Sequence, residues 1–172
     1  MNDINDPRFP IGRFEYPSAV SPLEREAMLE RIAAAPARLH AAVTGLTNGQ
    51  LDKTYREGGW TIRQVIHHVP DSHMNSYVRF KLALTEDEPT IKPYDVAAWA
   101  MLRDTAETPI ETSLVLLESL HARWVTLLRS LNEDQWSRGM RHPVNGLLRL
   151  DQLLALYAWH GDHHIAHIVN AV

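Results

Sequence analysis

The stretch TIRQVIHHVPDSHMNSYVRFKLALT, residues 61–85, begins with a helix-start signal and continues with the spacing of an amphipathic helix. Thr61 is followed three residues later by Gln64, the pattern of a capping box that satisfies the free amides at a helix start. Behind this box the apolar residues recur mostly every three or four positions: Ile62, Val65, Ile66, Val69, Tyr77 and Phe80. The spacing predicts a helix from Ile62 to about Leu84, which Pro70 should kink or break.

Three further segments have helical periodicity, and two of them have recognisable starts. Ser21-Pro22-Leu23-Glu24 combines an N-cap, a proline at the first helical position and a capping Glu, and Thr108-Pro109-Ile110-Glu111 repeats the pattern. The predicted long helices run from Pro22 to about Thr44 with a candidate bend at Pro36, from Pro109 to about Leu131, and from Leu150 to the end. A short helix is expected near Asp95 to Arg103, and residues 87–94 and 138–146 are expected to be loops.

Four long helices joined by irregular connections favour an all-α fold. The simplest arrangement is a four-helix bundle with an irregular N-terminal arm and at least one long crossover connection. The chain has 172 residues, with no internal repeat and no long Gly/Ser linker. We therefore expect a single domain spanning residues 1–172.

The composition excludes several classes of partner. The chain has 17 Lys+Arg and 21 Asp+Glu, a formal net charge of -4, and its basic residues are scattered, so nucleic acid is not expected as a partner. No apolar run approaches the roughly 20 residues of a membrane span, and the amino end does not resemble a secretory signal. We expect a cytoplasmic protein that acts on a small molecule. Because the chain has no Cys, any bound metal must be held by nitrogen or oxygen.

The last predicted helix carries four histidines on one face. In AWHGDHHIAHI, residues 158–168, His160, His163, His164 and His167 lie within one stripe because successive residues turn by about 100°. Two histidines four apart can bind one ion, and both His160 with His164 and His163 with His167 meet this condition. A metal site is favoured, and a polar core seam without metal remains the alternative.

A third ligand would have to come from another helix, and residues 62–84 contain three candidates. His73 falls on the apolar face, while His67 and His68 fall on opposite flanks. The flank of His68 also carries Ser72, Asn75 and Arg79, which is typical of a ligand followed by substrate-positioning groups in a cleft. A solvated polar face would have the same pattern, so both interpretations stay open.

Two segments in this order, GGWTIRQVIHHVPDSHMNSYVRFKLALTE (residues 58–86) and LYAWHGDHHIAHI (residues 156–168), resemble the DinB/YfiT family of metal-dependent enzymes, specifically its YfiT branch. The similarity extends to Pro10-Ile11-Gly12, to KPYD from Lys92 and to LHARWVTLLRSL from Leu120. It implies a four-helix bundle with one divalent ion per chain, zinc or nickel, in a homodimer. It further implies three ligands: His68 from the H-H-aliphatic motif, and His160 and His164 from H-x-x-x-H.

Three neutral imidazoles leave a coordination position open, which is typical of catalytic metal sites. His167, one turn after His164, is the candidate proton shuttle or hydrogen-bonding neighbour of a ligand. Asn75 and Arg79 are the candidates for substrate contact.

The predicted activity is hydrolysis by metal-activated water. Some close relatives in the family act as S-transferases for bacillithiol, so the alternative is activation of a low-molecular-weight thiol. A second alternative is a non-catalytic dimeric binding protein whose metal staples two helices, and a fourth ligand such as His163, His167 or His73 would favour it. His40 and His121 are isolated and are expected to be surface or satisfied core residues.

Overall fold

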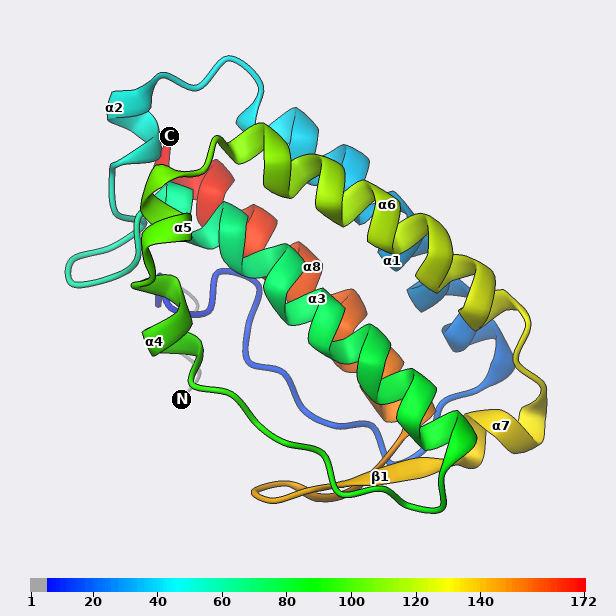
Figure 1. The fold of residues 1–172 in the computed structure, drawn as a ribbon. Coiled ribbons are helices and arrows are strands. Elements are labelled where there is room, and N and C mark those ends of the chain that lie inside the picture. The colour runs from blue at the N-terminus through cyan, green and yellow to red at the C-terminus, as the bar shows by residue number, and fades with distance from the viewer. Residues whose placement is uncertain (1–5) are drawn as a thin grey trace.

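Four long helices dominate the fold (Figure 1), as the periodicity predicts. The computed structural model describes residues 6–172. The long helices are α1 (Pro22–Val43), α3 (Ile62–Thr85), α6 (Ile110–Arg129) and α8 (Leu150–Ala171). The capping boxes at Ser21 and Thr61 both form, which explains why α1 and α3 begin where the sequence places them. The mostly helical bundle confirms the predicted fold class.

The long helices form a closed ring in which each packs against two others: α1 against α8 and α6, and α3 against α6 and α8. In Figure 1, α3 and α6 run in one direction, and α1 and α8 run in the other. Because α3 and α6 are neighbours that run in the same direction, the chain must return along the bundle between them. Residues 86–109 make this predicted long crossover. They contain two short helices, α4 (Val96–Ala100) and α5 (Arg103–Glu107), where the sequence predicted one.

Several local predictions were wrong. Residues 138–146, expected to be a loop, lie mostly in a hairpin of β1 (Gly139–His142) and β2 (Gly146–Arg149), which pair antiparallel with Gly139 opposite Arg149. The short helices α2 (Asn48–Leu51) and α7 (Glu133–Ser137) were not predicted. The capping pattern at Thr108 does not form: Pro109 is the N-cap of α6 and makes no side-chain cap.

Two prolines lie inside long helices without ending them. Pro70 lies within α3, so the expected break does not occur, and Pro36 lies within α1. Proline has no backbone N–H, so the carbonyl four residues earlier loses its helical donor. In α1 that carbonyl belongs to Ile32.

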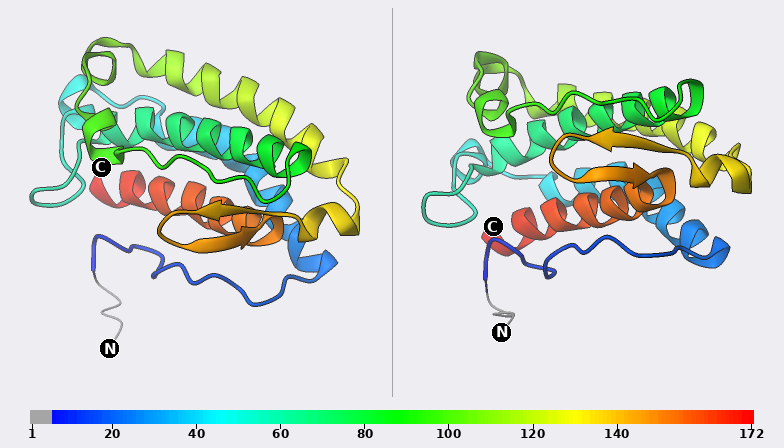
Figure 2. Two further views of the ribbon diagram at one scale, coloured as in Figure 1. Left: turned by 60° about the horizontal axis from the view of Figure 1, so that its bottom comes forward. Right: turned by 90° about the horizontal axis from the view of Figure 1, so that it is seen from below.

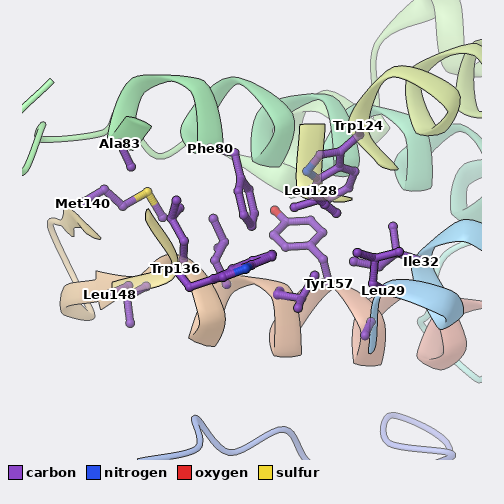
Figure 3. Close-up of a cluster of buried hydrophobic side chains, with 14 of the residues drawn as sticks. Leu29, Ile32, Phe80, Ala83, Trp124, Leu128, Trp136, Met140, Leu148 and Tyr157 are labelled. Carbon is purple, nitrogen blue, oxygen red and sulfur yellow. The ribbon is translucent and has the colours of Figure 1, made fainter. Parts of the chain in front are cut away.

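The core consists of two apolar clusters. One gathers around Phe80, Trp124, Trp136 and Tyr157 near the hairpin (Figure 3), and the other contains Leu39, Ile62, Val65, Ile66, Leu117, Ile165 and Ile168. On three helices a histidine occupies the sequence interval between the two clusters: the buried His73 on α3, the buried His121 on α6 and the half-buried His160 on α8. The imidazoles therefore form a polar layer inside the bundle.

The N-terminal arm is irregular, as predicted, and runs beside α8 (Figure 2). The Gln152 side chain donates to the Pro17 carbonyl at 2.9 Å, and the ring of Phe14 packs against that of Trp159 with centroids 5.7 Å apart. No helix within residues 6–172 is long and apolar enough to cross a membrane.

Candidate metal centre

Three imidazoles converge between α3 and α8. His68, His160 and His164 each offer one ring nitrogen, and these three atoms lie within 4.8 Å of one another. His160 and His164 share one face because they are four residues apart on a helix, and the packing of α3 against α8 brings His68 to them. The Nε2 atoms of His68 and His160 are 3.3 Å apart. The structure thus brings together the three residues that the family resemblance implies as ligands.

The surroundings keep these imidazoles neutral. His68 and His164 are only 7% and 9% exposed. Burial lowers the pKa of His68 to about 4. Burial, reinforced by the neighbouring imidazoles, holds the pKa values of His160 and His164 well below their usual range. Neutral imidazoles whose nitrogens face one another fit a shared divalent cation, and zinc, nickel, copper and iron all accept this ligand type.

Hydroxyl groups lie next to the imidazole cluster. Ser72 Oγ is 3.4 Å from His160 Nε2 and 3.5 Å from the Tyr157 hydroxyl. The Tyr94 hydroxyl is buried without a hydrogen-bond partner among the described residues. Burial raises the pKa of Tyr94 to about 12, and the nearby Ser72 hydroxyl acts in the opposite direction. The Trp60 ring packs edge-on against His68 at a centroid distance of 5.0 Å. One side of the cluster is therefore lined by hydroxyl groups and another is covered by an indole.

The other predicted site residues lie farther from the three nitrogens. His167 is behind His164, with its Nδ1 3.4 Å from His164 Nδ1, and its ring packs on Tyr55. Asn75 uses its amide to donate to the Asp71 carbonyl within α3 at 2.8 Å. Arg79 is half-buried on α3, one turn after Asn75.

The histidines considered as fourth ligands do not join the group. Within residues 6–172 the ligand cluster contains His68, His160 and His164 alone. His73 lies behind His160, with its Nε2 3.1 Å from His160 Nδ1. His163 stacks on Trp159 with centroids 4.2 Å apart. The described residues therefore offer three imidazoles to one candidate site.

His121 is a satisfied core residue, one of the two alternatives that the sequence predicted for it, but its connection to the site was not predicted. Its Nε2 is 2.8 Å from His73 Nδ1, so it is a hydrogen-bonded core residue connected to the imidazole cluster. The signal was present in the periodicity, because Leu117, His121, Trp124 and Leu128 share one face of α6.

Comparison with known proteins agrees with this description. Residues 31–168 match the DinB superfamily. A protein from Halalkalibacterium halodurans, named as a proposed metal-dependent hydrolase, is 49% identical over 97% of this chain and 97% of its own length. A Bacillus cereus protein with the same kind of name is 50% identical over 97% of this chain and 96% of its own length.

Two solved structures are similar. YfiT from Bacillus subtilis, described as a proposed metal-dependent hydrolase with an unusual four-helix bundle topology, superposes with a TM-score of 0.92 at 47% identity, covering 94% of this chain and 93% of its own. TT2238, a four-helix bundle protein, has a TM-score of 0.58 at 20% identity, covers 82% of this chain and 94% of its own, and shares the fold. On the extent of these matches, the chain belongs to the DinB superfamily.

Proposed function

We propose that this protein is a metal-dependent hydrolase in which His68, His160 and His164 hold one divalent ion, zinc or nickel. The observation that carries the proposal is the convergence of three neutral imidazole nitrogens, from two helices, within 4.8 Å. The names of the close relatives support the same activity. Three protein ligands leave a position for water or substrate, which favours catalysis over a purely structural staple.

The bound ion would supply acidification of a coordinated water, or stabilisation of a thiolate. The residues of the chain have distinct tasks beside it. Ser72 and Tyr157 present hydroxyls next to His160 and can orient a polar substrate group by hydrogen bonds. The unpartnered Tyr94 hydroxyl can bond to the same substrate. Trp60 covers His68 and limits the access of bulk water.

We assign the other predicted site residues to orienting a ligand or contacting the substrate. His167 contacts His164 on the Nδ1 side, so we assign it the role of orienting that ligand, in preference to proton transfer at the substrate. We assign Arg79 to an anionic part of the substrate, because no carboxylate among residues 6–172 forms a salt bridge with it. Asn75 is assigned to substrate contact through its carbonyl oxygen, because its amide nitrogen is engaged.

Elemental analysis of the purified protein tests the metal site. We expect about one zinc or nickel ion per chain in the wild type and none in His160→Ala. His40→Ala is the matched control, because His40 is exposed on α1 and its ring contacts only the hydroxyl of Thr44 among the hydrogen-bond partners in residues 6–172. Full metal content in His160→Ala would remove that residue from the ligand set.

Turnover assays then separate the two chemistries. The metal-loaded wild type should hydrolyse members of a panel of esters and amides without added thiol. Turnover that occurs only when a low-molecular-weight thiol and an electrophile are both supplied would replace the hydrolase with the S-transferase. If the metal-loaded protein catalyses neither hydrolysis nor thiol transfer, the remaining alternative is the non-catalytic binding protein whose metal joins two helices. The homodimer stays a prediction from the family resemblance.

A further inference from the structure

A continuous chain of hydrogen-bonded imidazoles leads away from the metal centre. His160 Nδ1 is 3.1 Å from His73 Nε2, and His73 Nδ1 is 2.8 Å from His121 Nε2. His121 Nδ1 is 2.8 Å from the backbone carbonyl oxygen of Ile32. His73 is 0% exposed and His121 is 2% exposed, so water does not compete for these contacts. The chain draws one group from each long helix: Ile32 on α1, His121 on α6, His73 on α3 and His160 on α8.

The Ile32 carbonyl, at the end of the chain of imidazoles, determines the direction of every hydrogen bond in it. A carbonyl can only accept, so His121 Nδ1 carries the hydrogen, and in a neutral ring His121 Nε2 is then the acceptor. His73 must therefore donate through Nδ1, which leaves His73 Nε2 to accept from His160 Nδ1. His160 Nε2 therefore keeps its lone pair, and this nitrogen lies 3.3 Å from His68 Nε2 and 3.4 Å from Ser72 Oγ in the candidate metal centre. Burial lowers the pKa values of all three rings, in agreement with neutral imidazoles.

The Ile32 carbonyl is able to accept from His121 because of a proline. In a regular helix the Ile32 carbonyl would accept from the N–H of residue 36, and residue 36 is Pro36, which has no N–H. The Ile32 carbonyl therefore turns its acceptor capacity to His121. This gives Pro36 a structural reason to lie in the middle of α1.

We infer that His73 and His121 are positioning residues that hold His160 in the tautomer whose Nε2 lone pair faces the metal. The inference rests on the proposed role of His160 as a ligand. The assembled bundle stabilises this tautomer before any ion arrives. Hydrogen-bond partners behind a ligand histidine generally fix its tautomer and orientation, and their loss weakens metal binding by about 10- to 100-fold.

The test uses nitrogen NMR on the metal-free wild type and zinc affinity on variants. In the wild type, His160 Nε2 should have the chemical shift of an unprotonated nitrogen, and Nδ1 that of a protonated one. The inference is overturned if Nε2 carries the proton. This measurement needs no variant, so it holds even if a core substitution prevents folding.

Substitutions at His121 test the consequence for affinity. His121→Leu removes the acceptor for His73, so we expect His160 to lose its tautomer preference and zinc affinity to fall about 10- to 100-fold in a chelator competition assay. His121→Gln offers both an N–H for Ile32 and an oxygen for His73, and should recover most of the affinity. The control is His40→Leu, which removes an exposed imidazole on α1 and should bind zinc as the wild type does.

The outcomes separate this inference from the proposed function. Wild-type affinity in His121→Leu, or failure of the Gln variant to improve on a folded Leu variant, would remove the positioning role while leaving the metal site intact. A wild type with the expected tautomer that binds neither zinc nor nickel would refute the proposed function and the ligand role on which the inference rests.

Discussion

At the scale of single residues, the buried histidines act through the lone pairs and hydrogens of neutral rings. Each neutral imidazole has one donor and one acceptor, so a buried ring must find one of each or leave a polar atom unpaired. His73 and His121 pair both nitrogens with protein groups. His68 and His160 instead turn their Nε2 atoms toward each other, where a cation can satisfy both. The cluster and its supporting histidines thus have different chemical tasks although their residue type is the same.

Asp71 supplies a prediction at this scale. It is half-buried on α3, and burial, with a smaller contribution from the Asp104 charge, raises the pKa of Asp71 to about 6. A carboxyl whose pKa is higher in the folded than in the unfolded state binds more protons when folded, so it lowers stability as pH rises from about 4 to about 6. Asp71→Asn should therefore increase the free energy of unfolding by about 1 kcal/mol at pH 7.5, after allowance for its partial exposure.

Urea unfolding of the wild type and Asp71→Asn at pH 7.5 and pH 4 measures this effect. The two proteins should differ at pH 7.5 and converge at pH 4, where the wild-type carboxyl is largely protonated in the folded state. An equal difference at both pH values would show that the carboxylate charge is not the cause.

At the scale of elements, the long helices were predictable because their signals are local. Capping residues and apolar spacing lie within a few positions of each other, so α1 and α3 could be placed from sequence to within about two residues. The hairpin was not predictable in this way. In its register Gly139 lies opposite Arg149, and the backbone of Arg141 also hydrogen-bonds to Pro89 and Ile91 of the crossover. These contacts connect segments that are distant in sequence and have weak individual patterns.

The close packing of the hairpin requires glycine at position 139, which can be tested. A Cβ at this position would lie 2.8 Å from the Leu148 carbonyl oxygen and 3.2 Å from the Leu147 side chain, so the backbone of β2 would have to move. We expect Gly139→Ala to lower the free energy of unfolding by about 1 to 3 kcal/mol. Gly49→Ala is the matched control, because a Cβ on Gly49 in α2 meets nothing within 4 Å.

Chemical denaturation of both variants gives the answer. Gly49→Ala should be neutral or slightly more stable, since alanine has the higher helix propensity by about 1 kcal/mol. Equal stability of Gly139→Ala and the wild type would mean that β2 moves freely and that the hairpin contributes little to the fold.

At the scale of the whole molecule, the bundle buries an unusual number of imidazoles. Within residues 6–172, seven histidines are buried: His67, His68, His73, His121, His163, His164 and His167. Burial lowers the pKa of every one of them, to about 4 for His121 and about 3 for His163. The folded protein therefore keeps neutral rings at pH values where an unfolded chain would protonate them.

This burial predicts acid sensitivity. Because the pKa values are lower in the folded state, the unfolded state binds more protons below pH 6.5, and stability is complete above that pH and lost as pH falls toward 4. One pH unit below 6.5, His68, His121 and His163, whose pKa values fall to about 3 or 4, each remove about 1 kcal/mol, so their sum exceeds the opposing gain from Asp71. Metal-free protein should show a steep fall in the free energy of unfolding between pH 7 and pH 5.

Urea titrations at pH 7.5, 6 and 5 on chelator-treated protein measure the slope. His67→Gln should reduce it, because it removes one buried imidazole that lies outside the metal ligand group. A free energy of unfolding that stays constant from pH 7.5 to pH 5 would contradict the prediction.

The sequence by itself determined the four long helices and the crossover, because helix starts and apolar spacing are local. Its H-x-x-x-H spacing offered two histidine pairs on the last helix, and the family resemblance selected His68, His160 and His164 among the candidates. It kept His73 as a possible fourth ligand and did not connect His121 to the site, because His73 and His121 lie 48 positions apart in the sequence. It treated Pro36 as a bend, whereas the assembled structure shows that the carbonyl freed in α1 accepts from His121 on α6. Tertiary structure decided these points because the direction of a hydrogen bond between imidazoles depends on which acceptor closes the chain, and that acceptor comes from another helix.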